Sequence, residues 1–306
     1  MVRVSAKTLL ALIRLARPTF LAGGIVGGVL GTVTALVEGR AFEPAAYALA
    51  QGTITSFHLM TQYANDYFDR AGDELGDRTE FSGGSGVLAE GSLSAATALR
   101  AALVCAGCGA IGVAALVGGG SIIAASLAVV MAAGAWTYSA PPLRLCARGL
   151  GEIDTTLVVA VLVPLVAYAA QARGVDLRAL AVTLPAAAAM LAMMIAVEVP
   201  DLAADRASRK RNLVVRLGRR GAGRLGRGAV VALFAAAVPC SLAFGAPITV
   251  APFALLTVPL AAALYRGFGE ARAALPGAAE SLAGRGVALF FLTAFGTALG
   301  EATLLR

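Results

Sequence analysis

Two clusters of acidic residues lie at the ends of long apolar stretches of this 306-residue chain. They are Asp66, Asp69 and Asp73, preceded by Asn65, and Glu198, Asp201 and Asp205. In each cluster the acids recur at i, i+3 and i+7, a spacing that predicts one face of a helix. Facing carboxylates repel one another unless cations lie between them. Oxygen ligands of this kind favour Mg²⁺, which proteins usually share with a substrate phosphate.

Basic residues follow each acidic cluster. They are Arg70 and Arg78 after the first, and Arg206, Arg209, Lys210 and Arg211 after the second. Acids and guanidinium groups together suit a ligand that carries both negative charge and metal, namely a diphosphate. The Ser-Gly-Gly-Ser-Gly stretch at 82–86 could supply backbone N–H groups to phosphate oxygens. Such a site would stabilise the pyrophosphate that leaves when the C–O bond of an allylic diphosphate ionises.

The composition indicates a polytopic membrane protein. Hydrophobic residues make up 58% of the chain and charged residues only 14%, with a mean hydropathy of +0.80. The formal charge of +7 does not indicate nucleic-acid binding, because the basic residues lie between apolar stretches without an aromatic platform. Cys105 and Cys108 lie in an apolar stretch without acidic or histidine neighbours, so we expect them to pack rather than to bind metal.

Apolar stretches long enough to cross a bilayer predict an all-α fold, a bundle of nine transmembrane helices around a central cavity. The expected spans are 19–37, 44–64, 96–117, 121–138, 153–172, 179–199, 228–245, 248–265 and 285–304. They form a single membrane-embedded domain over residues 1–306. A repeated order of span, acidic helix end, basic loop and span pair divides it into pseudo-repeated halves, 14–138 and 153–265, before the last helix at 285–304.

The distribution of lysine and arginine predicts the orientation. With these spans, 21 basic residues fall on the side of the N-terminus and 4 on the other. The positive-inside rule then places the N-terminus in the cytoplasm, and we expect a multi-pass protein of the cell (inner or plasma) membrane. Both acidic clusters and the longest loops, 65–95 and 200–227, fall on the cytoplasmic side. One acidic helix end is usually a solvated cap, but two matching ones on one side favour a functional site.

Several motifs resemble those of the UbiA superfamily of intramembrane prenyltransferases. Asn65-Asp66-Tyr67-Phe68-Asp69-x3-Asp73 resembles its first aspartate-rich motif, and Asp201-x3-Asp205 with residues 206–218 resembles its second. The segments 138–144 and 148–152 resemble the part of the family that follows the fourth helix, and Arg17-Pro18 resembles its entry to the first. These similarities follow the family's order from about residue 14 to residue 218.

The resemblance implies Mg²⁺-dependent transfer of an isoprenyl chain from an isoprenyl diphosphate donor to a small aromatic acceptor. It implies metal ligands at Asn65, Asp69, Asp73, Asp201 and Asp205. It implies diphosphate contacts from Arg70, Arg78, Arg144, Arg206 and Lys210. Asp66, as a catalytic residue, would be a close neighbour of the metal ligands and act either as a ligand itself or in handling the acceptor. Tyr138 would face the allylic carbon, where an aromatic ring stabilises a cation.

Within the superfamily, residues 83–86 and 148–152 look most like the 1,4-dihydroxy-2-naphthoate prenyltransferase branch, which makes menaquinone precursors. The second motif departs from that branch, which tends to have Asn near position 198. This chain has Glu198, followed by Pro200, which we expect to break the helix before Asp201. Glu198 either adds a carboxylate to the site or caps a helix. The departure leaves the acceptor open.

Three further polar residues lie in or at the start of predicted spans. His58, the chain's one histidine, either takes a proton from a phenolic acceptor or is a hydrogen-bonded residue of the bundle. Glu152 and Asp154 begin the fifth span, where acids commonly cap a helix.

Two other functions stay open. One is an intramembrane terpene cyclase of the same superfamily, which would ionise the same diphosphate and quench the cation internally. The other is a secondary transporter. It is the less favoured of the two, because the acidic residues lie at one face of the membrane rather than in mid-span. The sequence indicates neither the length of the isoprenyl chain nor the oligomeric state.

Overall fold

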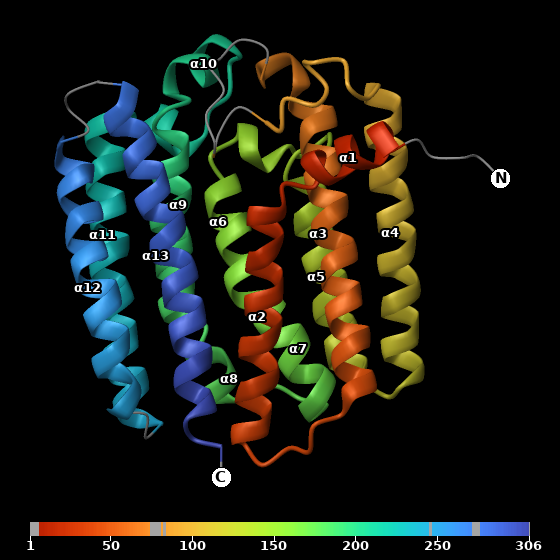
Figure 1. Cartoon of the computed structure of the whole chain (residues 1–306), viewed down its shortest axis with the longest axis vertical. Helices are drawn as coiled ribbons and strands as arrows, with labels where there is room; N and C mark the ends of the chain where they lie inside the picture. The colour runs from red at the N-terminus through yellow and green to blue at the C-terminus, as the bar shows by residue number, and fades with distance from the viewer. Residues whose placement is uncertain (1–5, 74–80, 82–83, 245–246, 271–275, 306) are drawn as a thin grey trace.

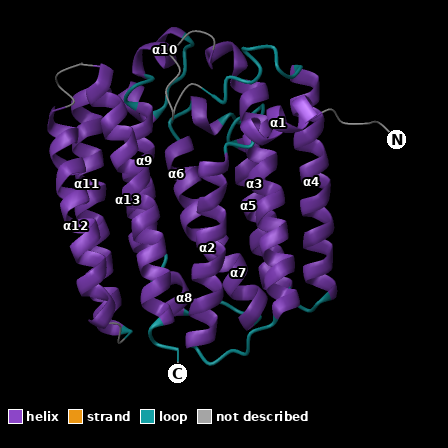
Figure 2. Ribbon diagram, in the orientation of Figure 1, coloured by secondary structure: helices purple, strands orange, loops and turns teal. Residues whose placement is uncertain are grey.

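The computed structural model describes residues 6–73, 81, 84–244, 247–270 and 276–305, and every regular element within these ranges is a helix (Figures 1 and 2). The first half comprises α1 (Ala6–Leu15), α2 (Pro18–Val37), α3 (Pro44–Asp73), α4 (Ala95–Gly118), α5 (Ile122–Thr137), the 3₁₀ turn η1 (Leu145–Ala147) and α6 (Gly151–Thr155). The second comprises the π-helical η2 (Thr156–Leu162), α7 (Val163–Ala172), α8 (Leu177–Ala181), α9 (Leu184–Glu198), α10 (Leu202–Ala207), α11 (Leu213–Ala243), α12 (Pro247–Glu270) and α13 (Pro276–Ala302).

The predicted all-α fold is confirmed, and each predicted span overlaps one helix or a run of consecutive helices. Within the described ranges, six segments are long and apolar enough to cross a membrane by length and composition. They are Pro18–Val37, Ala95–Gly118, Gly151–Ala172, Leu177–Glu198, Leu213–Ala243 and Gly277–Ala302. The apolar helix α5 is shorter, at 16 residues. The count of nine crossings and the orientation of the N-terminus stay predictions.

The region after α9 differs from the sequence-based expectation. Pro200 does separate α9 from α10, as predicted, so Glu198 and Asp205 lie on two different helices. The prediction of one helical face for the second acidic cluster is therefore wrong. The predicted loop 200–227 is also largely helical, because α11 already begins at Leu213. Asn212 caps this helix by accepting a hydrogen bond from the Val215 amide at 2.8 Å, and Gly218 with φ 64° kinks it.

Glycines let the central helix α2 approach its neighbours closely. A Cβ atom at Gly31 would lie 1.9 Å from the carbonyl oxygen of Pro164 in α7. A Cβ atom at Gly24 would lie 2.8 Å from Nδ1 of His58 in α3. Helices in lipid associate through such small residues. The contact at Gly24 also fixes the position of His58 between two helices.

Short helices and loops cover one end of the bundle. α1 lies across this end next to α3, far from the C-terminus (Figure 1). An ion pair of 2.8 Å between Arg14 and Glu90 joins α1 to the segment before α4. The Arg211 amide donates to the Ala147 carbonyl at 3.0 Å and joins the segments before α6 and α11. Both acidic clusters lie at this end.

Candidate functional site

A cavity of about 220 Å³ lies inside the bundle and is lined by a group of polar residues and by many apolar ones. Its polar lining includes Asn65, Asp69, Tyr138, Cys146, Glu198, Asp201, Asp205, Lys210 and Asn212. Its apolar lining includes Phe57, Met131, Val159, Val163, Met190, Met193, Phe290 and Phe291. This division suits a ligand with one charged end and a hydrocarbon body.

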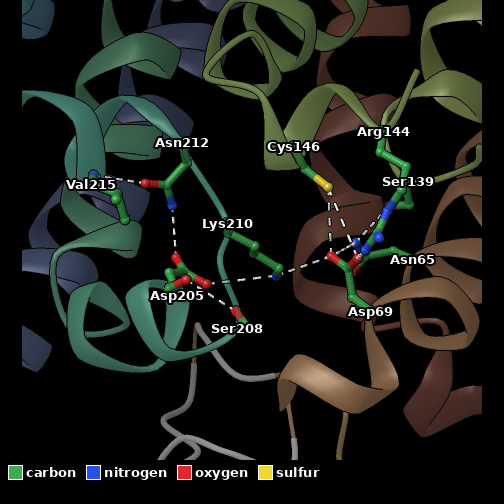
Figure 3. A network of polar contacts seen from close by, with 10 residues as sticks. All are labelled: Asn65, Asp69, Ser139, Arg144, Cys146, Asp205, Ser208, Lys210, Asn212 and Val215. Carbon is green, nitrogen blue, oxygen red and sulfur yellow. Dashed lines mark hydrogen bonds and ion pairs between the residues drawn. The ribbon is translucent and has the colours of Figure 1, made fainter. Parts of the chain in front are cut away.

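Asp69 is the centre of the polar network (Figure 3). It is only 5% exposed, and it accepts hydrogen bonds from four side chains of different elements. The donors are Asn65 Nδ2 at 3.2 Å, Arg144 Nη2 at 3.4 Å, Lys210 Nζ at 3.2 Å and Cys146 Sγ at 3.7 Å. Asn65 also donates to Ser139 Oγ at 2.8 Å, which orients the amide toward Asp69.

Lys210 joins the two acidic clusters. Its Nζ atom lies 3.2 Å from Asp69 and 3.7 Å from Asp205 Oδ1. Asp205 also accepts a hydrogen bond of 2.7 Å from Asn212 Nδ2 (Figure 3). Burial raises the pKa of Asp205, and the Lys210 ammonium and the Asn212 amide oppose that rise. Asp69 and Asp205, which are 141 and five positions from Lys210 in the sequence, thus both contact its positive charge.

Tyr138 and Cys146 form the wall beside Asp69. The Cys146 amide donates to the Tyr138 carbonyl at 2.9 Å, which holds the two residues together. Both residues line the cavity. Burial, and then the neighbouring charge of Asp69, raise the pKa of the Cys146 thiol to about 12. Cys146 is therefore a neutral donor at physiological pH.

Three predicted site residues point elsewhere. Asp66, which the resemblance made a catalytic residue, is buried and accepts hydrogen bonds from the amide and hydroxyl of Ser85. Arg70 is exposed and folds back on its own helix, with its guanidinium 4.8 Å from the Tyr67 ring centroid. Arg206 is exposed and is absent from the cavity lining. The side chain of Asp73 and all of Arg78 lie outside the described residues.

The glycine-rich stretch is partly at the cavity. Gly84, with φ 71°, lines it, and Gly86 also has a left-handed φ of 75°. A side chain would strain both positions. The Ser85 contact with Asp66 fastens this turn to α3. Ser82 and Gly83 lie outside the described residues, so the predicted phosphate contact of the whole stretch stays a prediction.

The structure places the polar residues His58, Glu198 and Glu152. His58 and Glu198 both line the cavity, and among described residues Glu198 Oε2 has no hydrogen-bond partner. Glu152 is fully buried and accepts a hydrogen bond from the Leu213 amide. It therefore caps α11, rather than the helix that it begins.

Four residues of the site were not predicted from the sequence: Arg17, Ser139, Cys146 and Asn212. Arg17 lines the cavity and donates to the Phe81 carbonyl at 3.2 Å. Its place before Pro18 at the end of an apolar stretch was a usable signal. Ser139 and Cys146 had none, because they meet α3 across 74 and 77 sequence positions.

The donor set suits a hard divalent cation. Two carboxylates already surround the Lys210 ammonium, and Asn65 and Asp201 offer further oxygens at the same cavity. Within the described ranges, no three acidic, histidine or cysteine side chains converge closely enough to hold a metal alone. Mg²⁺ commonly binds through one or two carboxylates and takes its other oxygens from water and phosphate. The site therefore fits Mg²⁺ bound together with a phosphate ligand.

Known structures share this fold. A UbiA homologue from Aeropyrum pernix K1 superposes with a TM-score of 0.68 at 16% identity, over 90% of this chain and 97% of that one. A structure concerned with digeranylgeranylglyceryl phosphate synthase gives 0.65 at 15% identity, over 96% and 99%. A UbiA homologue from Archaeoglobus fulgidus bound to GPP and Mg²⁺ gives 0.54 at 17% identity, over 94% and 99%.

A comparison with curated proteins gave no significant match. The family model of the UbiA prenyltransferase family, in contrast, matches residues 24–300, which include every described residue of both acidic clusters. With the helical bundle and the polar network at one end of its cavity, this match shows that the chain belongs to the UbiA prenyltransferase family.

Proposed function

We propose that this prenyltransferase carries out Mg²⁺-dependent transfer of an isoprenyl chain from an allylic isoprenyl diphosphate to an aromatic, quinone-precursor acceptor. The observation that carries this proposal is the Lys210 ammonium between Asp69 and Asp205 at the polar part of a mostly apolar cavity. Mg²⁺ could replace the ammonium group between these two carboxylates, and the ammonium group could then bind the diphosphate. The A. fulgidus homologue, bound to GPP and Mg²⁺, supports the choice of ligand.

Asp69 and Asp205 would hold Mg²⁺, together with Asn65, Asp201 and Asp73. Bound there, the metal would neutralise charge on the leaving pyrophosphate. Lys210 and Arg144 already donate to Asp69, at 3.2 and 3.4 Å, and are therefore the cations nearest to a diphosphate at this place. Their positive charge would favour departure of the pyrophosphate, because negative charge grows on the leaving oxygens as the C–O bond breaks.

The apolar part of the cavity would hold the isoprenyl chain and keep water from the allylic cation. Tyr138 lines the cavity, and its backbone carbonyl accepts a hydrogen bond from Cys146, a donor to Asp69. An aromatic face there would stabilise the cation. The 1,4-dihydroxy-2-naphthoate branch, and with it a role in menaquinone synthesis, rests on the motifs at 83–86 and 148–152. The basic-residue asymmetry supports an active site on the cytoplasmic side of the cell membrane.

A terpene cyclase is the second candidate. The aromatic rings of Phe57, Phe290 and Phe291 line the cavity and would also stabilise a cation that migrates along a folding chain.

Incubation of the purified protein with geranylgeranyl diphosphate and Mg²⁺, with and without 1,4-dihydroxy-2-naphthoate, separates these functions. We expect pyrophosphate and a prenylated naphthoate. A cyclic hydrocarbon or alcohol as the main product would refute the transferase. Asp69→Ala and Asp201→Ala should each abolish pyrophosphate release while the protein still folds in detergent. Full turnover in either variant would refute the metal-site assignment.

A further inference from the structure

Asp154 lines the cavity from α6 and is not part of the polar network around Asp69. Its Oδ1 atom lies against Gly134 of α5, where a Cβ atom would come within 2.7 Å of it. Glycine therefore provides the space that this carboxyl group fills. The carboxyl group is partly buried and forms no hydrogen bond or ion pair with the described residues. Asp154 lies in the first turn of α6, where an acid was expected, but its side chain forms no capping hydrogen bond there.

The surroundings of Asp154 indicate what it binds. Met131, Ala135 and Val158 line the same part of the cavity. An unpaired carboxylate among such residues is costly unless a ligand supplies a hydrogen-bond donor. A carboxylate only accepts hydrogen bonds, so neither a hydrocarbon chain nor a diphosphate satisfies it. The group that fits is a hydroxyl of the second substrate.

Asp154 is also close to the place where the bond would form. Gly134 precedes Tyr138 by four residues on the same helix, a rise of about 6 Å. Tyr138 in turn borders the polar network through Cys146. The Tyr138 ring also lies close to Gly151, three residues before Asp154 on α6, where a Cβ atom would come within 3.1 Å of Cε2. A hydroxyl bound at Asp154 would therefore lie about one helical turn from the residue that the tyrosine ring contacts.

We propose that Asp154 binds a hydroxyl group of the acceptor and takes up the proton released when the new bond forms. This inference rests on the proposed transferase function. The C–O bond of the allylic diphosphate breaks, and its electron pair leaves with pyrophosphate. An electron pair of the hydroxyl-activated acceptor forms the bond to the allylic carbon. The proton that the acceptor loses passes to the Asp154 carboxylate and then, after product release, to water.

His58 is the competing base. It lines the cavity from α3, and its Nδ1 atom is the one that approaches Gly24 of α2. Asp154 instead lies against α5, so the two groups approach the cavity from different helices. Separate substitutions therefore distinguish them.

The test measures how many prenylated acceptors form per pyrophosphate released. Full-length wild type, Asp154→Asn, Asp154→Glu and His58→Gln are assayed with geranylgeranyl diphosphate, Mg²⁺ and 1,4-dihydroxy-2-naphthoate. Glu280→Gln, at an exposed position of α13, is the matched carboxyl-to-amide control. General-base catalysis typically contributes about 10²–10⁴-fold, so we expect Asp154→Asn to lower this ratio at least about 100-fold. Prenyl alcohol should replace the product, the acceptor KM should rise, and Asp154→Glu should recover part of the ratio.

A ratio in Asp154→Asn equal to that of the wild type would overturn the inference, as would a loss found only in His58→Gln. If Asp154→Asn does not fold, Gly134→Ala tests the same contact, because its Cβ would come within 2.7 Å of both the Asp154 carboxylate and the Val158 side chain and, by displacing the carboxylate, should lower the ratio too. An unchanged ratio in Gly134→Ala would then count against the inference. A wild type that releases no pyrophosphate would refute the proposed function itself, and this inference with it. Normal release with normal transfer in Asp154→Asn refutes the inference alone.

Discussion

Replacing Lys210 by methionine should weaken the protein without metal and strengthen its response to Mg²⁺. Methionine keeps much of the length of lysine and removes the charge. Asp69 and Asp205 both contact one Nζ atom, at 3.2 and 3.7 Å, so these carboxylate oxygens lie no more than about 7 Å apart. At an effective dielectric constant of about 20, two charges at that separation repel by at least roughly 2 kcal/mol. The lysine offsets this repulsion in the wild type.

The variant should therefore melt about 4 °C lower in metal-free detergent, since about 1 kcal/mol shifts the melting temperature of a protein this large by roughly 2 °C. Mg²⁺ should then raise the melting temperature of the variant more than that of the wild type, because the metal no longer displaces an ammonium group. Fluorescence of Trp136, the chain's one tryptophan, reports the transition, since it packs edge-on against Phe68 of α3 at 6.0 Å.

Lys7→Met is the matched control, because Lys7 is the other lysine of the chain and is exposed on α1. It should leave both melting temperatures unchanged. The reasoning fails if Lys210→Met is as stable as the wild type without metal and shows the same Mg²⁺ shift. That result would mean that the two carboxylates do not share a charge in solution.

Two further perturbations test the surroundings of the site. Ser85→Ala removes the hydroxyl that bonds to the buried Asp66, and should cost about 1–3 kcal/mol of stability in thermal unfolding; an unchanged melting temperature would contradict this contact. Cys146, with its pKa raised to about 12, should react slowly with iodoacetamide at pH 8, where only about one thiol in ten thousand is ionised. Mass spectrometry should find faster modification as the pH rises, and rapid labelling at pH 8 would contradict the raised pKa.

Helical periodicity accounts for what could be predicted of the first cluster. Asn65 and Asp69 are four residues apart and both line the cavity, as does His58 two turns earlier. Asp66 and Arg70 are each one residue further along, about 100° around the helix, and they point elsewhere. The i, i+4 pattern therefore identified residues that share this cavity, and the role expected of Asp66 stays a prediction.

The second cluster was harder to predict, because its contacts depend on how the chain turns after Pro200. Asp205 lies on α10, and Lys210 follows in the turn before α11. The span ranges could be predicted because hydrophobicity alone sets where helices run in a bilayer. The start of α11 could not be predicted in this way. The helix begins after its cap at Asn212, well before its apolar part, and hydropathy detects only the apolar part. Asp154 was likewise read as a cap, because the glycine that receives it lies 20 positions earlier.

The most direct test of the central claim is an experimental structure with Mg²⁺ and a non-reactive thiolodiphosphate analogue of geranylgeranyl diphosphate. We predict metal about 2.1 Å from carboxylate oxygens of Asp69 and Asp205, with Lys210 moved from between them onto a phosphate oxygen. The isoprenyl chain should lie among Met190, Met193 and Phe290. An analogue bound outside this cavity, or Lys210 still joining the two carboxylates with no metal between them, would contradict the account.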